Sequence, residues 1–135
     1  MTPAEPKRSA NRLESFQNAF AGWVALIRGT PNARIHFAFA LAATAVGLWL
    51  GLTFVEWAIL WLTIGLVITA EFVNSAIEAT IDLASPEIHP LAKAAKDMAA
   101  GGVLFAALTA VIVGLLILGP PLITRLKPIL SPLLH

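Results

Sequence analysis

Residues 57–82 read WAILWLTIGLVITAEFVNSAIEATID, an apolar segment that ends in a run of ionisable side chains. The carboxylates and the asparagine of this run share one face of an α-helix and are named here the polar stripe: Glu71, Asn74, Glu78 and Asp82. On such a helix they lie within about 80° of one another. A carboxylate at membrane depth costs roughly 2.5 to 3.5 kcal/mol to insert, so it indicates a functional site. We therefore predict a membrane-spanning helix that carries a functional polar stripe.

The composition of the whole chain is typical of a membrane protein. Hydrophobic residues make up 58% of the 135 residues and charged residues only 13%, whereas soluble domains have about 25% charged residues. Nine basic residues against eight acidic ones leave a net charge near zero, which argues against nucleic acid as a partner. The chain contains no cysteine, so it has neither a disulfide nor a thiolate metal site.

Two further apolar segments are long enough to cross a bilayer. Residues 35–52 are 18 residues without a charge, or about 27 Å of helix. Residues 97–118 contain an uncharged run of similar length. We predict an all-α integral membrane protein with three transmembrane helices, over 35–52, 57–82 and 97–118. Gly119-Pro120-Pro121 is expected to end the last helix and to leave residues 119–135 as a C-terminal tail without much fixed structure.

The segment before the first span predicts a helix on the membrane surface. Aromatic and apolar residues recur at helical spacing on one face of residues 13–28: Phe16, Phe20, Trp23 and Ile27. The helix is too polar to span and follows a basic segment, so we expect it to lie flat in the headgroup region. An ordinary helix packed against the core is the alternative. Residues 1–12 are expected to be a mobile lead-in.

The lysines and arginines predict the orientation of the chain. Seven of the nine lie on the side of the N-terminus and of the connector at 83–95: Lys7, Arg8, Arg12, Arg28, Arg34, Lys93 and Lys96. Only Arg125 and Lys127 lie on the other side. Because cytoplasmic flanks carry the excess of basic residues, we expect the N-terminus and the polar stripe on the cytoplasmic side.

Lys96 and Asp97 begin the third span at about the depth where the second ends, and we expect them to face Glu78. Phosphoryl transfer needs a carboxylate that holds Mg²⁺, a cation that neutralises phosphate charge and a carboxylate that accepts the proton of the attacking hydroxyl. These residues match that requirement but do not by themselves name an enzyme. A proton-relay or ion-transport protein and a purely structural contact between helices are the alternatives.

Two blocks of sequence, E-x-x-N-S-A-I-E-x-x-x-D at 71–82 and A-K-D-M-A-A-G at 95–101, carry a resemblance. Their residues and their spacing resemble the signature of the small bacterial membrane lipid kinases, the diacylglycerol kinase and undecaprenol kinase family. R-x-x-S-F-x-x-A from Arg12 and N-A-R-I-H from Asn32 resemble the family's surface helix and the start of its first span. The resemblance covers roughly residues 12–118.

The resemblance implies a lipid kinase domain over residues 13–118 that works as a homotrimer in the bacterial inner membrane, with active sites between subunits. It implies that MgATP is used to phosphorylate a lipid alcohol, with Glu71 as the base at the substrate hydroxyl and Glu78 as a metal ligand. The residues that it implies at the nucleotide are Arg12, Asn74, Glu78, Glu87, His89, Lys96 and Asp97. Thr30 stands where the family commonly has a metal-binding glutamate, and its hydroxyl can bind Mg²⁺ but brings no charge.

The lipid substrate is suggested by two shorter phrases. H-P-L-A-K-A-A-K-D and A-A-G-G-V-L are more similar to the undecaprenol kinase branch, so we expect undecaprenol to be preferred over diacylglycerol. A non-catalytic or ion- or proton-translocating membrane protein of the same fold is the alternative. His36 is expected to be an interfacial anchor or hydrogen-bond donor, and Asp82 either supports the site or is the solvated end of its helix.

Overall fold

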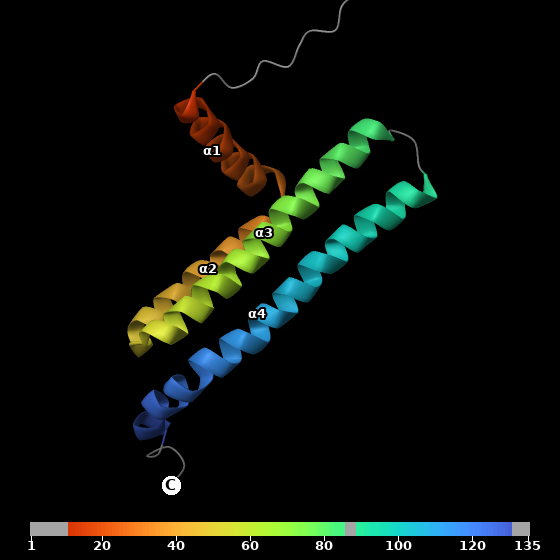
Figure 1. Ribbon diagram of the computed structural model, residues 1–135. Coiled ribbons are helices and arrows are strands. Elements are labelled where there is room, and N and C mark those ends of the chain that lie inside the picture. The colour runs from red at the N-terminus through yellow and green to blue at the C-terminus, as the bar shows by residue number, and fades with distance from the viewer. Residues whose placement is uncertain (1–10, 86–88, 131–135) are drawn as a thin grey trace, which may run out of the picture.

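Helices form the regular structure of this protein. The computed structural model describes residues 11–85 and 89–130 (Figure 1). Within these ranges four helices follow one another: α1 Arg12–Gly29, α2 Pro31–Leu50, α3 Phe54–Ala84 and α4 Pro90–Leu130. Each of α2, α3 and α4 is long and apolar enough to cross a membrane. The prediction of an all-α protein with three spans is confirmed.

A tight turn joins α2 to α3. Gly51 ends α2 with a φ of 74°, a left-handed conformation that costs other residues roughly 1–2 kcal/mol. Thr53 and Glu56 then cap the start of α3. The Thr53 N–H donates to Glu56 Oε2 at 2.7 Å, and the Glu56 N–H donates to Thr53 Oγ1 at 3.4 Å. These local bonds fix the point at which the chain reverses.

A hydrophobic core lies beside this turn. A cluster of buried apolar residues joins the three long helices there: Leu50, Leu52, Leu60 and Ile117. Gly47 allows the close approach, because a Cβ at this position would lie 3.0 Å from Leu52 Cδ1 and 3.1 Å from Trp57 Cη2. The three spanning helices therefore share an apolar core at the end away from the polar stripe.

The C-terminal part of α4 corrects one prediction. The helix runs through Pro120 and Pro121 to Leu130, so the expected stop at Gly119 and the irregular tail were wrong for residues 119–130. Each proline removes a backbone donor, but membrane helices tolerate this where tertiary contacts hold the backbone. Leu122 packs against the buried cluster, and the Arg125 guanidinium lies 5.2 Å from the centre of the Trp49 ring. Residues 131–135 lie outside the described residues.

Two other helix boundaries differ from those expected. α2 begins at Pro31, four residues earlier than predicted, because proline suits the first position of a helix. Thr30 alone separates α1 from α2. α3 continues to Ala84, and the short helix expected after Pro90 within the 83–95 connector is continuous with the third span in α4.

α1 leaves the bundle at an angle to the three long helices (Figure 1). Its predicted apolar face is uncovered, with Phe16 75% and Phe20 70% exposed. Near its end, Trp23 packs against Phe37 of α2 and Phe72 of α3, with ring centroids 5.8 and 5.2 Å away. The helix predicted at 13–28 is confirmed as a helix, while its place on the membrane surface stays a prediction.

Arg34 fixes the elbow between α1 and α2. Its Nε donates to the Ile27 carbonyl at 2.8 Å, and its Nη2 donates to the Arg28 carbonyl at 2.6 Å. These carbonyls belong to the last turn of α1 and have no partner within the helix. A cation at a helix C-terminus also interacts favourably with the helix dipole. Arg34 thus places the end of α1 beside the start of α2.

Candidate active site

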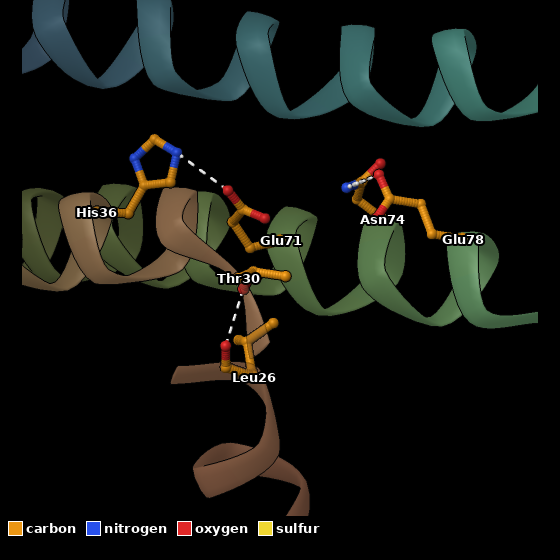
Figure 2. A network of polar contacts seen from close by, with 6 residues as sticks. All are labelled: Leu26, Thr30, His36, Glu71, Asn74 and Glu78. Carbon is orange, nitrogen blue, oxygen red and sulfur yellow. Dashed lines mark hydrogen bonds and ion pairs between the residues drawn. The ribbon is translucent and has the colours of Figure 1, made fainter. Parts of the chain in front are cut away.

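Glu71 lies in the middle of α3 and is the most deeply buried residue of the polar stripe. Its side chain is 2% exposed, and His36 Nε2 of α2 lies 3.2 Å from its Oε1 (Figure 2). The ring nitrogen is close to Oε1 but is not in line for a good hydrogen bond. The two groups are thus within contact distance but share no hydrogen bond in this geometry. The fold therefore places an ionisable ring against the carboxylate proposed as the catalytic base.

Asn74 and Glu78 form the next polar pair along α3. Asn74 Nδ2 donates to Glu78 Oε1 at 3.0 Å (Figure 2). Asn74 is only 8% exposed, and its Oδ1 is buried without a partner in the described part of the chain. A carboxylate beside an unfilled amide oxygen is a donor set that suits Mg²⁺. No described group of three or more acidic, histidine or cysteine side chains gathers at one point, so further ligands would come from phosphate, water or another subunit.

Thr30 lies at the junction of α1 and α2. Its hydroxyl donates to the Leu26 carbonyl at 2.8 Å. Figure 2 shows that this hydroxyl is turned toward Leu26 and away from Asn74 and Glu78. The hydroxyl therefore helps to close the end of α1, and its role as a metal ligand stays a prediction.

The structure corrects the expected neighbour of Lys96. Its ammonium group pairs with Asp82, one helical turn beyond Glu78 on α3. Asp97 pairs with Lys93 on its own helix at 2.5 Å. Both pairs are open to solvent, although Lys96 is partly covered, and exposed pairs contribute at most about 1 kcal/mol. Lys96 is thus held at the Asp82 end of the polar stripe, whereas Asp97 is paired within α4.

Three other residues were expected at the nucleotide, namely Arg12, Glu87 and His89. His89 precedes α4 and caps it, since its Nδ1 accepts a hydrogen bond from the Leu91 N–H at 3.2 Å. Arg12 is exposed in the first turn of α1, about 27 Å along that helix from Thr30. Glu87 lies outside the described residues. Within one chain, Arg12 is not brought to the polar stripe.

An apolar groove begins beside the Glu71 site. It has a volume of about 490 Å³ and runs between α2, α3 and α4 from His36 toward Leu122. Two polar side chains, His36 and Thr63, are among its lining residues, and the Thr63 hydroxyl is already bonded to the Ile59 carbonyl at 2.8 Å. The groove therefore suits a hydrocarbon chain, and its His36 end is next to a buried carboxylate.

The stretch that contains this site also matches a known family. The family model for prokaryotic diacylglycerol kinase matches residues 17–118, which include the polar stripe, His36 and Lys96. The chain belongs to the prokaryotic diacylglycerol kinase family. The prediction of a lipid kinase is therefore confirmed at the level of the family, and with three apolar helices the chain is a multi-pass membrane protein.

Individual relatives of this kinase family agree with the assignment. Undecaprenol kinase of Bacillus subtilis is 41% identical over 123 residues, which cover 90% of this chain and 100% of the relative. Diacylglycerol kinase of Synechocystis sp. is 43% identical over 115 residues, or 84% of this chain and 66% of the relative. Diacylglycerol kinase of Escherichia coli (strain K12) is 39% identical over 72 residues, or 53% of this chain and 59% of the relative.

Two contacts of this kinase were not predicted from the sequence, the His36–Glu71 contact and the Arg34 elbow. Both residues belong to the block N-A-R-I-H at the start of an apolar helix. Residues two apart on a helix point about 200° away from each other. Arg34 can therefore contact α1 while His36 contacts α3. The sequence did contain a signal for these contacts, namely two polar residues on opposite faces of an apolar helix.

Proposed function

We propose that this kinase transfers the γ-phosphate of MgATP to a membrane lipid alcohol, with undecaprenol preferred and diacylglycerol as a second substrate. The observation that carries the proposal is the buried Glu71 carboxylate, whose neighbour His36 lines the head of the apolar groove. A groove with few polar groups accepts the hydrocarbon tail of a lipid alcohol, and a nearby carboxylate accepts a proton from the terminal hydroxyl of that lipid. The preference for undecaprenol is supported by the full-length match to undecaprenol kinase of Bacillus subtilis.

The proposed reaction uses Glu71 as the general base. The lipid hydroxyl gives its proton to Glu71 while its oxygen forms a bond to the γ-phosphorus. The bond from that phosphorus to the β–γ bridging oxygen breaks, and ADP leaves with the electron pair. General base catalysis of this kind contributes about 10²–10⁴-fold to the rate.

The proposed Mg²⁺ ligands of the protein are Glu78 and Asn74. The unpartnered Asn74 Oδ1 and the Glu78 carboxylate fit this ion, which takes few protein ligands and keeps phosphate oxygens and water. When bound, Mg²⁺ offsets negative charge on the phosphates. Thr30 is proposed as a further ligand, directly or through water. The remaining residues proposed for the nucleotide are Arg12, Glu87, His89, Lys96 and Asp97.

The proposed assembly is a homotrimer in the bacterial inner membrane, with the N-terminus and the active site on the cytoplasmic side. Within one chain most of each spanning segment is uncovered, which leaves room for contacts with other subunits as well as with lipid. Other subunits can also complete the surroundings of the polar stripe, where Glu78 is partly exposed within one chain.

A direct assay tests the proposed function. The purified chain in lipid bilayers is given ATP labelled in the γ-phosphate together with undecaprenol or diacylglycerol. We expect labelled lipid from both, with more from undecaprenol at equal mole fraction, and almost none from a Glu71→Gln variant prepared in parallel. Label no higher than in a reaction without enzyme would overturn the proposal, and ATP consumption independent of lipid would favour a different activity.

A further inference from the structure

We infer that His36 is a positioning residue that orients the Glu71 carboxylate for proton transfer. This inference rests on the proposed role of Glu71 and adds to it a residue that the sequence predicted only as an interfacial anchor or hydrogen-bond donor. It is carried by the burial of both side chains, the short distance between them and their place at the head of the apolar groove.

Glu71 needs a partner because of its burial. It is the largest side chain that is fully buried among the residues the structure describes, and a carboxylate without compensation is costly in such a place. The described ion pairs give Glu71 no cationic neighbour other than His36. His36 Nε2, at 3.2 Å from Oε1, therefore lies where compensation is required.

His36 is held where it can orient the carboxylate. Its side chain is 19% exposed, so it is turned mainly into the protein. The side chain of an interfacial anchor would instead be turned into the headgroup region. The start of α2 is fixed by Pro31 and by the two hydrogen bonds of Arg34 to α1. The imidazole therefore projects from a backbone that is anchored on both sides of the elbow.

The contact gives the two oxygens of the Glu71 carboxylate different roles. Once the imidazole is aligned, an Nε2–H group donating to Oε1 would restrict rotation of the carboxylate and leave Oε2 to accept the substrate proton. Both the neutral Nε2–H tautomer and the imidazolium supply this donor. Because His36 also lines the groove, the hydroxyl of a lipid in the groove would arrive beside the carboxylate that His36 orients.

Kinetics of two variants test the inference. His36→Leu removes the donor and retains an apolar side chain, whereas His36→Gln retains an N–H donor. We expect His36→Leu to lower kcat by about tenfold to a hundredfold, because small misplacements of reacting groups have effects of this size. The KM for MgATP should stay within about twofold, since nucleotide binding is not disturbed. His36→Gln should keep at least about a third of the wild-type kcat if the donor is what matters.

A packing role would give a different pattern. Wild-type kcat in His36→Leu, or an equally low kcat in His36→Gln and His36→Leu, would overturn the inference. Ala38→Leu is the matched control, because Ala38 is an exposed residue of the same helix and its substitution also introduces a leucine. It should retain the wild-type kcat.

A spectroscopic measurement tests the contact without relying on activity. The chain has three histidines, at 36, 89 and 135, so ¹⁵N-histidine labelling gives few signals, and the His36 signal is the one lost in His36→Gln. We expect Glu71→Gln, and Glu71→Asp as a second variant, to shift the His36 Nε2 resonance and not those of the other two histidines. An unmoved His36 resonance would overturn the inference even if the chain is an active kinase. Absence of lipid phosphorylation by the wild type would instead reject the proposed function.

Discussion

Glu71 and Glu78 lie seven residues apart on α3 but have different surroundings, which gives them separable roles. Glu71 is buried against His36, whereas Glu78 accepts a hydrogen bond from Asn74 and is partly exposed. Loss of a general base removes an interaction that develops only with the transferred proton. We expect Glu71→Gln to lower kcat by about 10²–10⁴-fold, with the KM for MgATP within about twofold of wild type. Steady-state kinetics in detergent–lipid micelles measure both, and a large rise in KM at unchanged kcat would contradict the assignment.

Glu78 should respond to magnesium. Glu78→Gln removes one proposed charged ligand, so the Mg²⁺ concentration for half-maximal rate should rise by about tenfold, and added Mg²⁺ should recover part of the rate. The measurement is a Mg²⁺ titration at saturating ATP. Glu71→Gln is the control, because excess Mg²⁺ should not rescue it. Rescue of Glu71→Gln in place of Glu78→Gln would mean that the two glutamates have exchanged roles.

The elements show where prediction from the sequence succeeded and where it stopped. Hydropathy and length identified α2, α3 and α4, because a membrane span is a property of one segment. The same local reasoning failed at Pro120 and Pro121, where packing of Leu122 on the buried cluster and the Arg125–Trp49 contact keep α4 helical. Helix termini depend on such contacts between elements, which a local pattern does not contain.

The candidate site, too, was predicted from the sequence only in part. Periodicity placed Glu71, Asn74 and Glu78 on one face of one helix, because all three belong to the same element. The partner of Glu71 on α2 and that of Lys96 on α3 depend on the relative positions of two helices along their axes. A local pattern does not contain these relative positions, so the expected partner of Lys96, Glu78, was one helical turn from the observed partner, Asp82.

The elbow between α1 and α2 gives a prediction at the level of the element. Arg34→Ala leaves the carbonyls of Ile27 and Arg28 without their side-chain donors. We expect faster amide hydrogen exchange in the last turn of α1 and a loss of about 1 kcal/mol in stability. Arg28→Ala is the matched control, because it removes a basic residue from the same region without removing these bonds. Equal exchange rates in both variants would show that Arg34 does not hold the elbow.

Orientation can be tested on the whole molecule because the chain has no cysteine of its own. Ala94→Cys and Lys127→Cys place single thiols at exposed positions near the two ends of α4. In sealed right-side-out spheroplasts, an impermeant thiol reagent should label Lys127→Cys and not Ala94→Cys, because the excess of basic residues marks the cytoplasmic side. After lysis both should react. Labelling of Ala94→Cys alone before lysis would reverse the proposed orientation.

The extent of uncovered surface gives a second prediction for the whole molecule. Large apolar residues are exposed on all three spanning helices, among them Phe39, Leu62 and Leu116, which are each more than 70% exposed. We expect a trimer, in which part of this surface and the polar groups of α3 are covered by other subunits. Light scattering corrected for bound detergent gives the protein mass. A monomer that retains full activity would contradict the proposed assembly.

The length of α3 has a consequence for the solvent that surrounds each reactant. Glu71 lies 17 residues after Phe54, or about 26 Å along the helix, and Glu78 lies about 36 Å along it. With Phe54 at one boundary of a hydrocarbon layer about 30 Å thick, Glu71 falls just inside the opposite boundary and Glu78 outside it. A highly charged nucleotide can then remain hydrated, while the lipid alcohol keeps its tail in the hydrocarbon layer. Only the phosphoryl group has to pass from the aqueous phase to the hydrocarbon layer.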